Sequence, residues 1–353
     1  QYFMYAILQV PVGIASRWIK PQKLLAAGAL IDGIGTGIFG LSHQFSIVVA
    51  SRLIVGTGDA LVWLNIVLVI SQWFGPKVFG RVLGLTAMGG TLGALFATYP
   101  LAVWIHLSGW RLPFEIMSVL LIVLALWTIW LLNRHHAPHD VQPAPAQPLA
   151  VQWKTLWHHP RSILSPMMTH FGFMGPYIGF VSVFAVPYLE KAYHVTLIHA
   201  SIYLTVSLIG ALVASPLMGR LSDTWGPRKP YQFAAAVTIL AWILLMASPS
   251  GWPKIVLAVL FFGIGFGNGA SVLTFTVVRQ HFHREDVGLA SGVANSTGFL
   301  SAVLTPLGMG IILTLLSHAP MDIAYRSALA LLALFSLVGC VGTLLIDPSA
   351  KTA

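Results

Sequence analysis

Two long apolar runs are separated by the short, polar, basic stretch Gly219-Arg220-Leu221-Ser222-Asp223-Thr224-Trp225-Gly226-Pro227-Arg228-Lys229. Gly219 and Gly226 are expected to permit a tight reversal, because glycine adopts backbone conformations that other residues avoid. Asp223 places a carboxylate where a helix is expected to end. The pair Arg228 and Lys229 favours the cytoplasmic side of a membrane, where short loops carry an excess of basic residues. The stretch predicts a basic cytoplasmic turn between two membrane-spanning helices.

The composition excludes a water-soluble protein. Of the 353 residues, 57% are hydrophobic and only 8% are charged, whereas soluble globular proteins carry roughly 25% charged residues. A chain so poor in charge requires lipid as its solvent. The net charge of +9 is spread over short loops, so we expect no nucleic-acid partner. The single cysteine, Cys340, lies in an apolar run and excludes a disulfide framework.

Eleven apolar runs are long enough to be predicted as membrane helices. Five form an N-terminal bundle over residues 1–132, and six form a C-terminal bundle over residues 161–353. A polar, Pro-rich linker over residues 133–160 separates them. Its histidines indicate a solvated segment rather than a metal site: His135, His136, His139, His158 and His159. The predicted helices cover residues 2–15, 24–41, 46–73, 80–106, 113–132, 162–188, 200–221, 231–247, 255–278, 287–316 and 324–346.

The basic residues orient the chain. If the loops alternate across the membrane, fourteen of the nineteen Lys and Arg residues share the side of the 133–160 linker, and five lie opposite. The positive-inside rule places that side, and the linker, in the cytoplasm. We therefore predict an integral multi-pass protein of the bacterial inner membrane that acts as a monomer.

The two halves of the chain form an internal repeat at a nearly constant offset of 206 to 209 positions. Parallel repeats of this kind are one architecture of secondary transporters. The matching positions are Gly13, Ser16, Pro21 and Lys23 with Gly219, Ser222, Pro227 and Lys229; Gly56 to Ala60 with Gly265 to Gly269; Gly80, Gly84 and Gly90 with Gly288, Gly292 and Gly298; and Pro100 with Pro306.

The Gly219 to Lys229 stretch resembles the loop signature of the major facilitator superfamily, the twelve-helix secondary transporters. Three further segments resemble its second, fourth and sixth helices: Gln9-Val10-Pro11-Val12-Gly13, Arg52-Leu53-Ile54-Val55-Gly56-Thr57-Gly58 and Gly109-Trp110-Arg111. The resemblance implies an all-α fold of two pseudo-symmetric six-helix bundles. It makes the eleven runs helices two to twelve, with the first helix missing before Gln1.

This chain departs from the family pattern in its first half. Arg17 stands where the loop signature has Asp, and Lys20 where it has Gly. If the loops hold one conformation, that role is expected to rest on Asp223. The degenerate copy favours a transport-dead sensor or scaffold as one alternative. An efflux antiporter is another, although Gly84 to Gly93 lacks the Gly-Pro step that marks many drug–proton antiporters.

Asp59 and Arg52 are the leading candidates for the substrate and proton pathway. They lie seven residues apart in one run, so they share a helix face. They predict either an ion pair in a wet cavity or an anion site at Arg52 with a proton carried by Asp59. The alternative is a structural arginine near the outer surface. By resemblance, this helix lines the central cavity of the family.

Other polar residues in the runs have two interpretations each. Asn268 is the repeat equivalent of Asp59 and binds a polar solute or forms a helix–helix hydrogen bond; Asn65 and Asn295 leave the same choice. His170 relays protons or packs as a neutral ring. Asp32 is expected to pair with a neighbouring helix, and Glu115 with Arg111. Close helix packing is predicted at Gly80, Gly84, Gly288 and Gly292.

The runs contain no motif of an enzyme and none that requires a cofactor or a metal. We therefore predict a secondary active transporter of a small polar solute, an organic anion or an amino-acid-like metabolite. Alternating access moves the solute past a site at the bilayer midplane. Protons are the coupling ion that Asp59 would serve.

Overall fold

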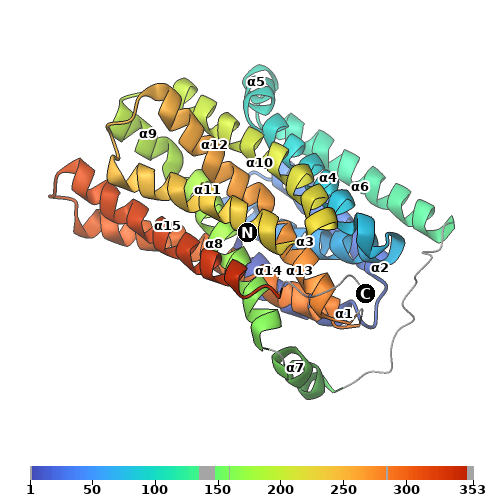
Figure 1. Cartoon of the computed structure of the whole chain (residues 1–353). Helices are drawn as coiled ribbons and strands as arrows, with labels where there is room; N and C mark the ends of the chain where they lie inside the picture. Colours follow the sequence, from blue (N-terminus) through green and yellow to red (C-terminus); the bar gives the residue numbers. More distant parts are fainter. Residues whose placement is uncertain (1, 135–147, 159, 284, 348–353) are drawn as a thin grey trace. The chain divides into compact units, whose positions relative to one another are not determined.

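The computed structural model describes residues 2–134, 148–158, 160–283 and 285–347, and none of these residues forms a β-strand. Its elements are labelled in Figure 1. They are α1 (Tyr2–Ala15), α2 (Pro21–Leu41), α3 (Phe45–Trp73), α4 (Pro76–Phe96), α5 (Tyr99–Ser108), α6 (Arg111–Arg134), α7 (Leu149–His158), α8 (Pro160–Gly179), the π-helical segment η1 (Phe180–Phe184), α9 (Ala185–Tyr193), α10 (Leu197–Trp225), α11 (Arg228–Ala247), α12 (Lys254–Ala270), α13 (Leu273–His281), α14 (Val287–Leu315) and α15 (Met321–Leu344).

The predicted count of eleven spans is one too high. Within the described residues, ten helices are long and apolar enough to cross a membrane, and α1 is a shorter apolar helix of 14 residues. At 1.5 Å per residue it is about 21 Å long, less than the roughly 30 Å thickness of a hydrocarbon core. The apolar pattern gave the correct bounds of α1 but not its reach.

One predicted helix, over residues 80–106, is broken in two. The structure has α4, a turn at Ala97 and Thr98, and then α5. Pro100 lacks a backbone N–H, and its ring crowds the preceding turn, which favours a break at this point. The repeat-equivalent Pro306 nevertheless lies inside the unbroken α14, where it packs against Gly179 of α8. Tertiary packing therefore decides whether the proline ends the helix.

The 133–160 linker is not entirely irregular, since its last part forms α7. Leu156 of this helix is buried, while Lys154 and Trp157 are exposed. Its apolar residues at helical spacing explain why it folds. Four of the linker histidines, His135, His136, His139 and His159, lie outside the described residues.

The run predicted over residues 162–188 also differs from a simple helix, because α8 passes through η1 into α9. Pro166 and Pro176 lie inside α8. A π-helical turn often accompanies such interruptions of the regular hydrogen-bond ladder. Together these three elements form one continuous apolar span of 34 residues.

The helices group into two compact units, which do not coincide with the two halves of the sequence. Unit 1 contains residues 1–75, 96–159 and 282–296, and unit 2 contains residues 76–95, 160–281 and 297–353. The swapped segments are most of α4 and the start of α14, which carry the predicted packing glycines.

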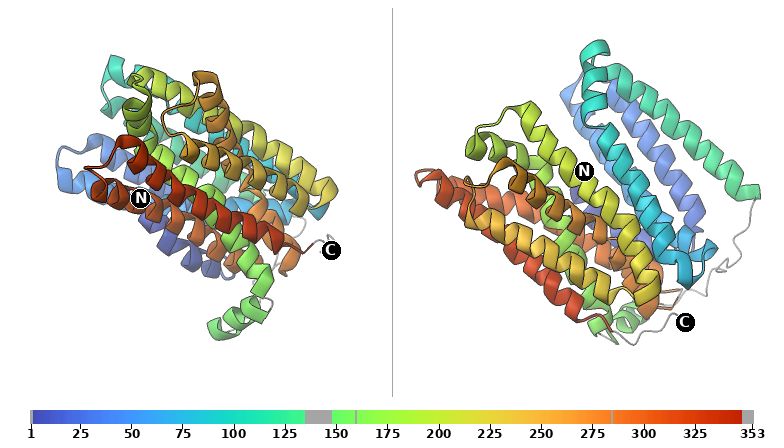
Figure 2. Two further views of the ribbon diagram at one scale, coloured as in Figure 1. Left: turned by 60° about the vertical axis from the view of Figure 1, so that its left-hand side comes forward. Right: turned by 45° about the horizontal axis from the view of Figure 1, so that its top comes forward.

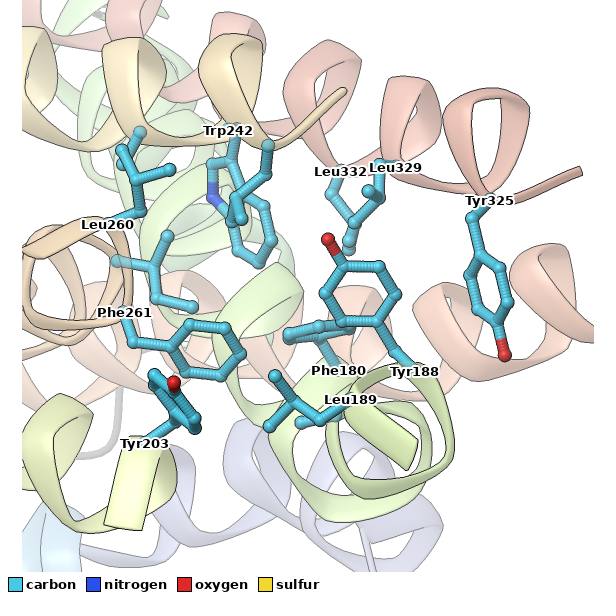
Figure 3. Close-up of a cluster of buried hydrophobic side chains, with 14 of the residues drawn as sticks. Phe180, Tyr188, Leu189, Tyr203, Trp242, Leu260, Phe261, Tyr325, Leu329 and Leu332 are labelled. Carbon is cyan, nitrogen blue, oxygen red and sulfur yellow. The ribbon is translucent and has the colours of Figure 1, made fainter. Parts of the chain in front are cut away.

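In unit 1, α2 packs against both α3 and α6, and α1 packs against α3. Figure 2 shows α2, α3 and α6 running side by side. In unit 2, α10 packs on α12, and α15 packs on α8 and α11. The large buried cluster of unit 2 is rich in aromatic residues. The ring of Phe180 packs edge-on against Trp242, with centroids 5.4 Å apart, and is tilted against Tyr188 at 5.9 Å (Figure 3).

The Gly219 to Lys229 stretch is mostly helical, which corrects one expectation. Gly219 and Asp223 lie in the last turns of α10, and the reversal occurs only at Gly226 and Pro227. Gly226 has φ = 75°, a left-handed conformation that favours glycine. Gly219 serves another purpose, since a Cβ there would meet the carbonyl oxygen of Gly80 on α4. Arg228 and Lys229 open α11.

Candidate functional site

A cluster of ionisable side chains occupies the α2–α3 pair of unit 1. Asp32 of α2 is hydrogen-bonded to Asp59 of α3 and lies close to the charge of Arg52, on the same helix as Asp59. Thr36 Oγ1 donates to Asp32 Oδ1 over 3.4 Å. Tyr5 of α1 also lies near both carboxyl groups. Asp32 therefore pairs with the neighbouring helix α3, as predicted, and its partner there is Asp59.

A close approach of two backbones brings Asp32 to Asp59. A Cβ at Gly58 would lie 2.6 Å from the backbone nitrogen of Asp32 and 2.7 Å from the carbonyl oxygen of Gly28. Only a residue without a side chain fits there, because both neighbours are backbone atoms. The Gly56-Thr57-Gly58-Asp59 sequence therefore places a carboxyl group one residue after the tightest point of the α2–α3 contact.

The guanidinium of Arg52 contacts aromatic rings as well as being attracted by carboxylates. Its Cζ lies 3.5 Å from the centroid of Phe39 and 5.4 Å from that of Phe114. Such cation–π contacts stabilise an arginine that has left water. Arg52 is only half-buried, so its cationic edge remains available to an anion. This placement agrees with both interpretations of the pair.

Two asparagines predicted as site residues lie in unit 1 with different partners. Asn295 Nδ2 donates to Gln9 Oε1 over 2.7 Å, and Gln9 Nε2 donates to the Ala60 carbonyl oxygen over 3.1 Å. Asn295 thus forms the helix–helix hydrogen bond that was its alternative role. Asn65 Nδ2 bonds its own helix at Leu61, while its buried Oδ1 accepts no hydrogen bond from the described residues. That oxygen is a candidate acceptor for a solute or water.

The two candidates of unit 2 lie on different helices. Asn268 is half-buried on α12. His170 of α8 is 2% exposed and packs edge-on against Phe275, with ring centroids 5.3 Å apart. Its ring also fills the space beside Gly298, where a Cβ would collide with it. A tightly packed ring favours the structural interpretation of His170 over the proton relay.

Sequence reasoning missed a buried polar network in unit 2. Tyr231 Oη and Thr274 Oγ1 are 2.9 Å apart, and Thr274 Oγ1 lies 3.3 Å from Thr169 Oγ1. Hydroxyl groups are common in membrane helices and carry a weak signal, so only the fold reveals that three separate helices bring them together.

Sequence reasoning also missed the role of Gln9, which bridges Asn295 and Ala60 by hydrogen bonds. A glutamine inside an apolar run was the signal that could have indicated this role.

Asp223 joins α10 to the start of α4. Its two carboxylate oxygens accept hydrogen bonds from the backbone N–H groups of Gly80 and Arg81, each over 2.8 Å. A carboxylate is favoured near a helix N-terminus. Gly80 and Gly84 allow the approach, because a Cβ at either would collide with α10. The predicted packing role of these glycines and the predicted role of Asp223 thus meet in one contact.

Gly288 and Gly292 make the equivalent contact between α14 and α1. A Cβ at Gly292 would lie 2.5 Å from the carbonyl oxygen of Gln9, and one at Gly13 would lie 2.6 Å from that of Gly288.

Among the described residues, no group of three or more His, Cys, Asp or Glu side chains forms a metal site.

The predicted pair of Arg111 and Glu115 is not formed. Arg111 Nη2 donates to the Ser42 carbonyl oxygen over 3.4 Å and lies 3.2 Å from His43 Nδ1 instead.

Comparison with known proteins decides the family. The profile described as "Major Facilitator Superfamily" matches residues 1–186 and again residues 167–353. The chain belongs to the major facilitator superfamily. The two matches divide the chain at about its midpoint, in agreement with the repeat. Members of this family are transporters rather than enzymes, and the chain is an integral multi-pass membrane protein.

Several relatives are named as transporters of sugar acids. The chain is 23% identical to the D-galactonate transporter of Escherichia coli, over 96% of this chain and 84% of that protein. It is 24% identical to the probable galactarate/D-glucarate transporter GudP of Bacillus subtilis, over 96% and 81%. The human glucose-6-phosphate exchanger SLC37A2 is 28% identical but matches only 40% of this chain and 29% of its own length.

The fold agrees with a solved member of the superfamily. A crystal structure of the fucose:proton symporter FucP of E. coli superposes with a TM-score of 0.79 at 14% identity, covering 98% of this chain and 88% of the other. At that identity the likeness shows the fold alone. The expected all-α facilitator fold is therefore confirmed, with ten described spans in place of eleven.

Proposed function

We propose that this protein is a secondary active transporter of a small organic anion of the sugar-acid class, coupled to protons. The single observation that carries the proposal is the cluster of Arg52, Asp59 and Asp32 on α2 and α3. Arg52 supplies a positive charge for a carboxylate, and a carboxyl group beside it supplies a place for a proton. The sugar-acid relatives support this solute class over an amino-acid-like metabolite.

Buried charges in a membrane are costly and generally mark transport pathways. When Asp59 is ionised, Arg52 is balanced by it; when a carboxylate solute arrives, protonation of Asp59 frees Arg52 to bind it. The competition couples solute to proton without a further group. We propose that the two six-helix bundles alternate access around this cluster, in the inner membrane, as a monomer with the 133–160 linker in the cytoplasm.

The test is proton movement in proteoliposomes. The protein is placed in liposomes that hold a pH-sensitive dye, and D-galactonate, galactarate, an amino acid and fucose are added in turn outside. Acidification of the interior on addition of a sugar acid alone supports symport of that class. A response to fucose or to the amino acid alone contradicts the anion assignment. Silence across the panel, with intact folding by thermal unfolding, favours the alternatives of efflux or a transport-dead sensor.

A further inference from the structure

Arg17, which stands where the family's loop signature has Asp, has ion-pair partners in the structure. Arg17 follows α1, and its side chain is 5% exposed. Its Nη1 lies 3.5 Å from Asp286 Oδ1, and its Nη2 lies 3.8 Å from Glu285 Oε2. These two carboxylates immediately precede α14. The arginine therefore ties the end of α1 to the start of α14 within unit 1.

The second repeat makes a corresponding helix contact, but its loop residue has the opposite charge and binds backbone N–H groups. Asp223 is the repeat equivalent of Arg17 at an offset of 206, and it holds the start of α4 through backbone N–H groups. Lys77 is the equivalent of Glu285 at an offset of 208. Thus one copy has a carboxylate at this loop position and a lysine at the start of the partner helix, while the other copy has an arginine at the loop position and two carboxylates before the partner helix.

The backbone around the two contacts is alike, so the main difference between them is the charge of the residues at positions 17 and 223. Ser16 Oγ donates to Gly13, as Ser222 Oγ donates to Gly219, over 2.7 and 2.8 Å. Added Cβ atoms at Gly13 and at Gly219 would both meet a glycine carbonyl of the partner helix. An arginine facing a bare helix N-terminus would be repelled by its positive end, so Arg17 requires the carboxylates at α14.

We propose that Arg17 and the pair Glu285–Asp286 form a charge-exchanged lock between α1 and α14, which replaces the carboxylate-to-helix contact of the second repeat and opens during transport. The opening step rests on the proposed function, whereas the ion pair does not. The first loop signature is compensated rather than degenerate, and the main feature that favoured a transport-dead protein loses its weight.

Cysteine labelling tests the lock without any solute. Ser296 of α14 donates to the Ala6 carbonyl oxygen of α1 over 2.9 Å, so α1 covers it while the contact holds. Ser296→Cys in a Cys340→Ser background is labelled with a maleimide in detergent. Arg17→Asp and Asp286→Arg should each speed labelling about five- to thirtyfold, the factor that corresponds to about 1–2 kcal/mol, because Glu285 is half exposed and the pair is only partly buried.

The double variant Arg17→Asp/Asp286→Arg decides the outcome. It should return the labelling rate to within about twofold of the parent, because exchanged charges pair again. Labelling as fast as in the single variants overturns the proposal. The matched control is read by thermal unfolding, since Ser296 reports only on the contact of α1 with α14. Asp223→Arg should be destabilised, and adding Lys77→Asp should not restore stability, because Asp223 is held by backbone N–H groups that cannot be exchanged. Rescue there would overturn the difference between the repeats.

Thermal unfolding against pH covers the case in which Asp286→Arg does not fold. Burial raises the pKa of Asp286, and the charge of Arg17 opposes that rise, with Glu285 and His283 as the other charged neighbours. A raised pKa means that ionised Asp286 costs stability as pH rises through it, and Arg17 offsets that cost. Arg17→Gln should therefore destabilise most at neutral pH, and least once acid protonates Asp286.

A destabilisation that does not change with pH would show that Arg17 acts through packing alone and would overturn the lock. The labelling and unfolding results do not require transport. If no solute of the panel moves while the double variant is rescued, the proposed function fails and the ion pair stands.

Discussion

The α2–α3 pair of unit 1 and the α11–α12 pair of unit 2 share one packing motif and differ in chemistry. Gly58 and Gly267 are repeat equivalents at an offset of 209, and each brings its helix against the neighbour, at Asp32 in one case and Thr238 in the other. Asp32 and Thr238 are themselves equivalent at an offset of 206. The closest point of both helix pairs thus carries a polar residue, charged in one unit and neutral in the other.

The difference extends along the helices. Arg52 corresponds to Phe261, which is fully buried in the aromatic cluster of unit 2, and Asp59 corresponds to Asn268. All three charged residues of the Arg52, Asp59 and Asp32 cluster therefore have neutral equivalents. A repeated backbone allows one copy to specialise in charge while the other supplies packing and hydrogen bonds. The comparison supports the proposal that the charged cluster of unit 1 handles the ions, and exchanging residues between the copies tests it.

The largest effect is expected from Asp59→Asn, which gives α3 the residue of its counterpart. Proton-driven accumulation should fall to background, because an amide cannot take up a proton, while exchange of solute across the liposome persists. Uptake under an imposed pH gradient and counterflow under none measure the two. Retention of gradient-driven uptake would remove Asp59 from the proton pathway. Asn268→Ala serves as the matched change in unit 2 and should leave coupling intact.

Arg52→Phe should have the next largest effect. It removes the cation that faces a carboxylate solute, and hydrogen bonds to charged groups contribute about 1.5–3 kcal/mol, so the apparent affinity should fall about ten- to a hundredfold. Arg52→Lys keeps the charge and should recover part of the loss. The KM for a sugar acid measures both. An unchanged KM in Arg52→Phe would return Arg52 to the structural role.

Gly58→Ala should destabilise the protein by about 1–3 kcal/mol through overpacking, since the added Cβ meets backbone atoms that cannot rotate away. Gly267→Ala meets Thr238 side-chain atoms instead, so Thr238→Ala, which removes Oγ1 and Cγ2 but keeps Cβ, should restore most of the stability. Thermal unfolding measures all three. Gly89→Ala is the control, because nothing lies within 4 Å of a Cβ there. Equal stability of Gly58→Ala and Gly89→Ala would contradict the close approach.

Asp32→Thr should have the smallest effect. It places the residue of unit 2 beside Asp59 and removes one carboxyl group of the hydrogen-bonded pair. Coupling should persist, since Asp59 and Arg52 remain, but the pH at which uptake is half-maximal should shift, because two adjacent carboxyl groups titrate together. The pH profile of uptake measures the shift. A profile that superposes on the parent would confine Asp32 to packing.

Much of this arrangement could be predicted from the sequence, because the bilayer imposes strong rules. Apolar runs of sufficient length must become helices, so α3 was predicted to within one residue of its bounds. The seven-residue spacing of Arg52 and Asp59 placed them on one helical face. The break before Pro100 and the helix α7 were not predicted, since a proline in a helix and a short amphipathic segment each depend on their neighbours.

The sequence by itself determined the membrane class, the repeat and the charged candidates, since hydropathy, spacing and charge are properties of the chain alone. Only the tertiary structure decided which polar residues meet. Asp32 reaches Asp59 because Gly58 lets two backbones touch. Arg17 finds Asp286 across 269 positions because Gly13 and Gly288 do the same. Contacts between distant segments follow from packing, and packing depends on the shape of both partners at once.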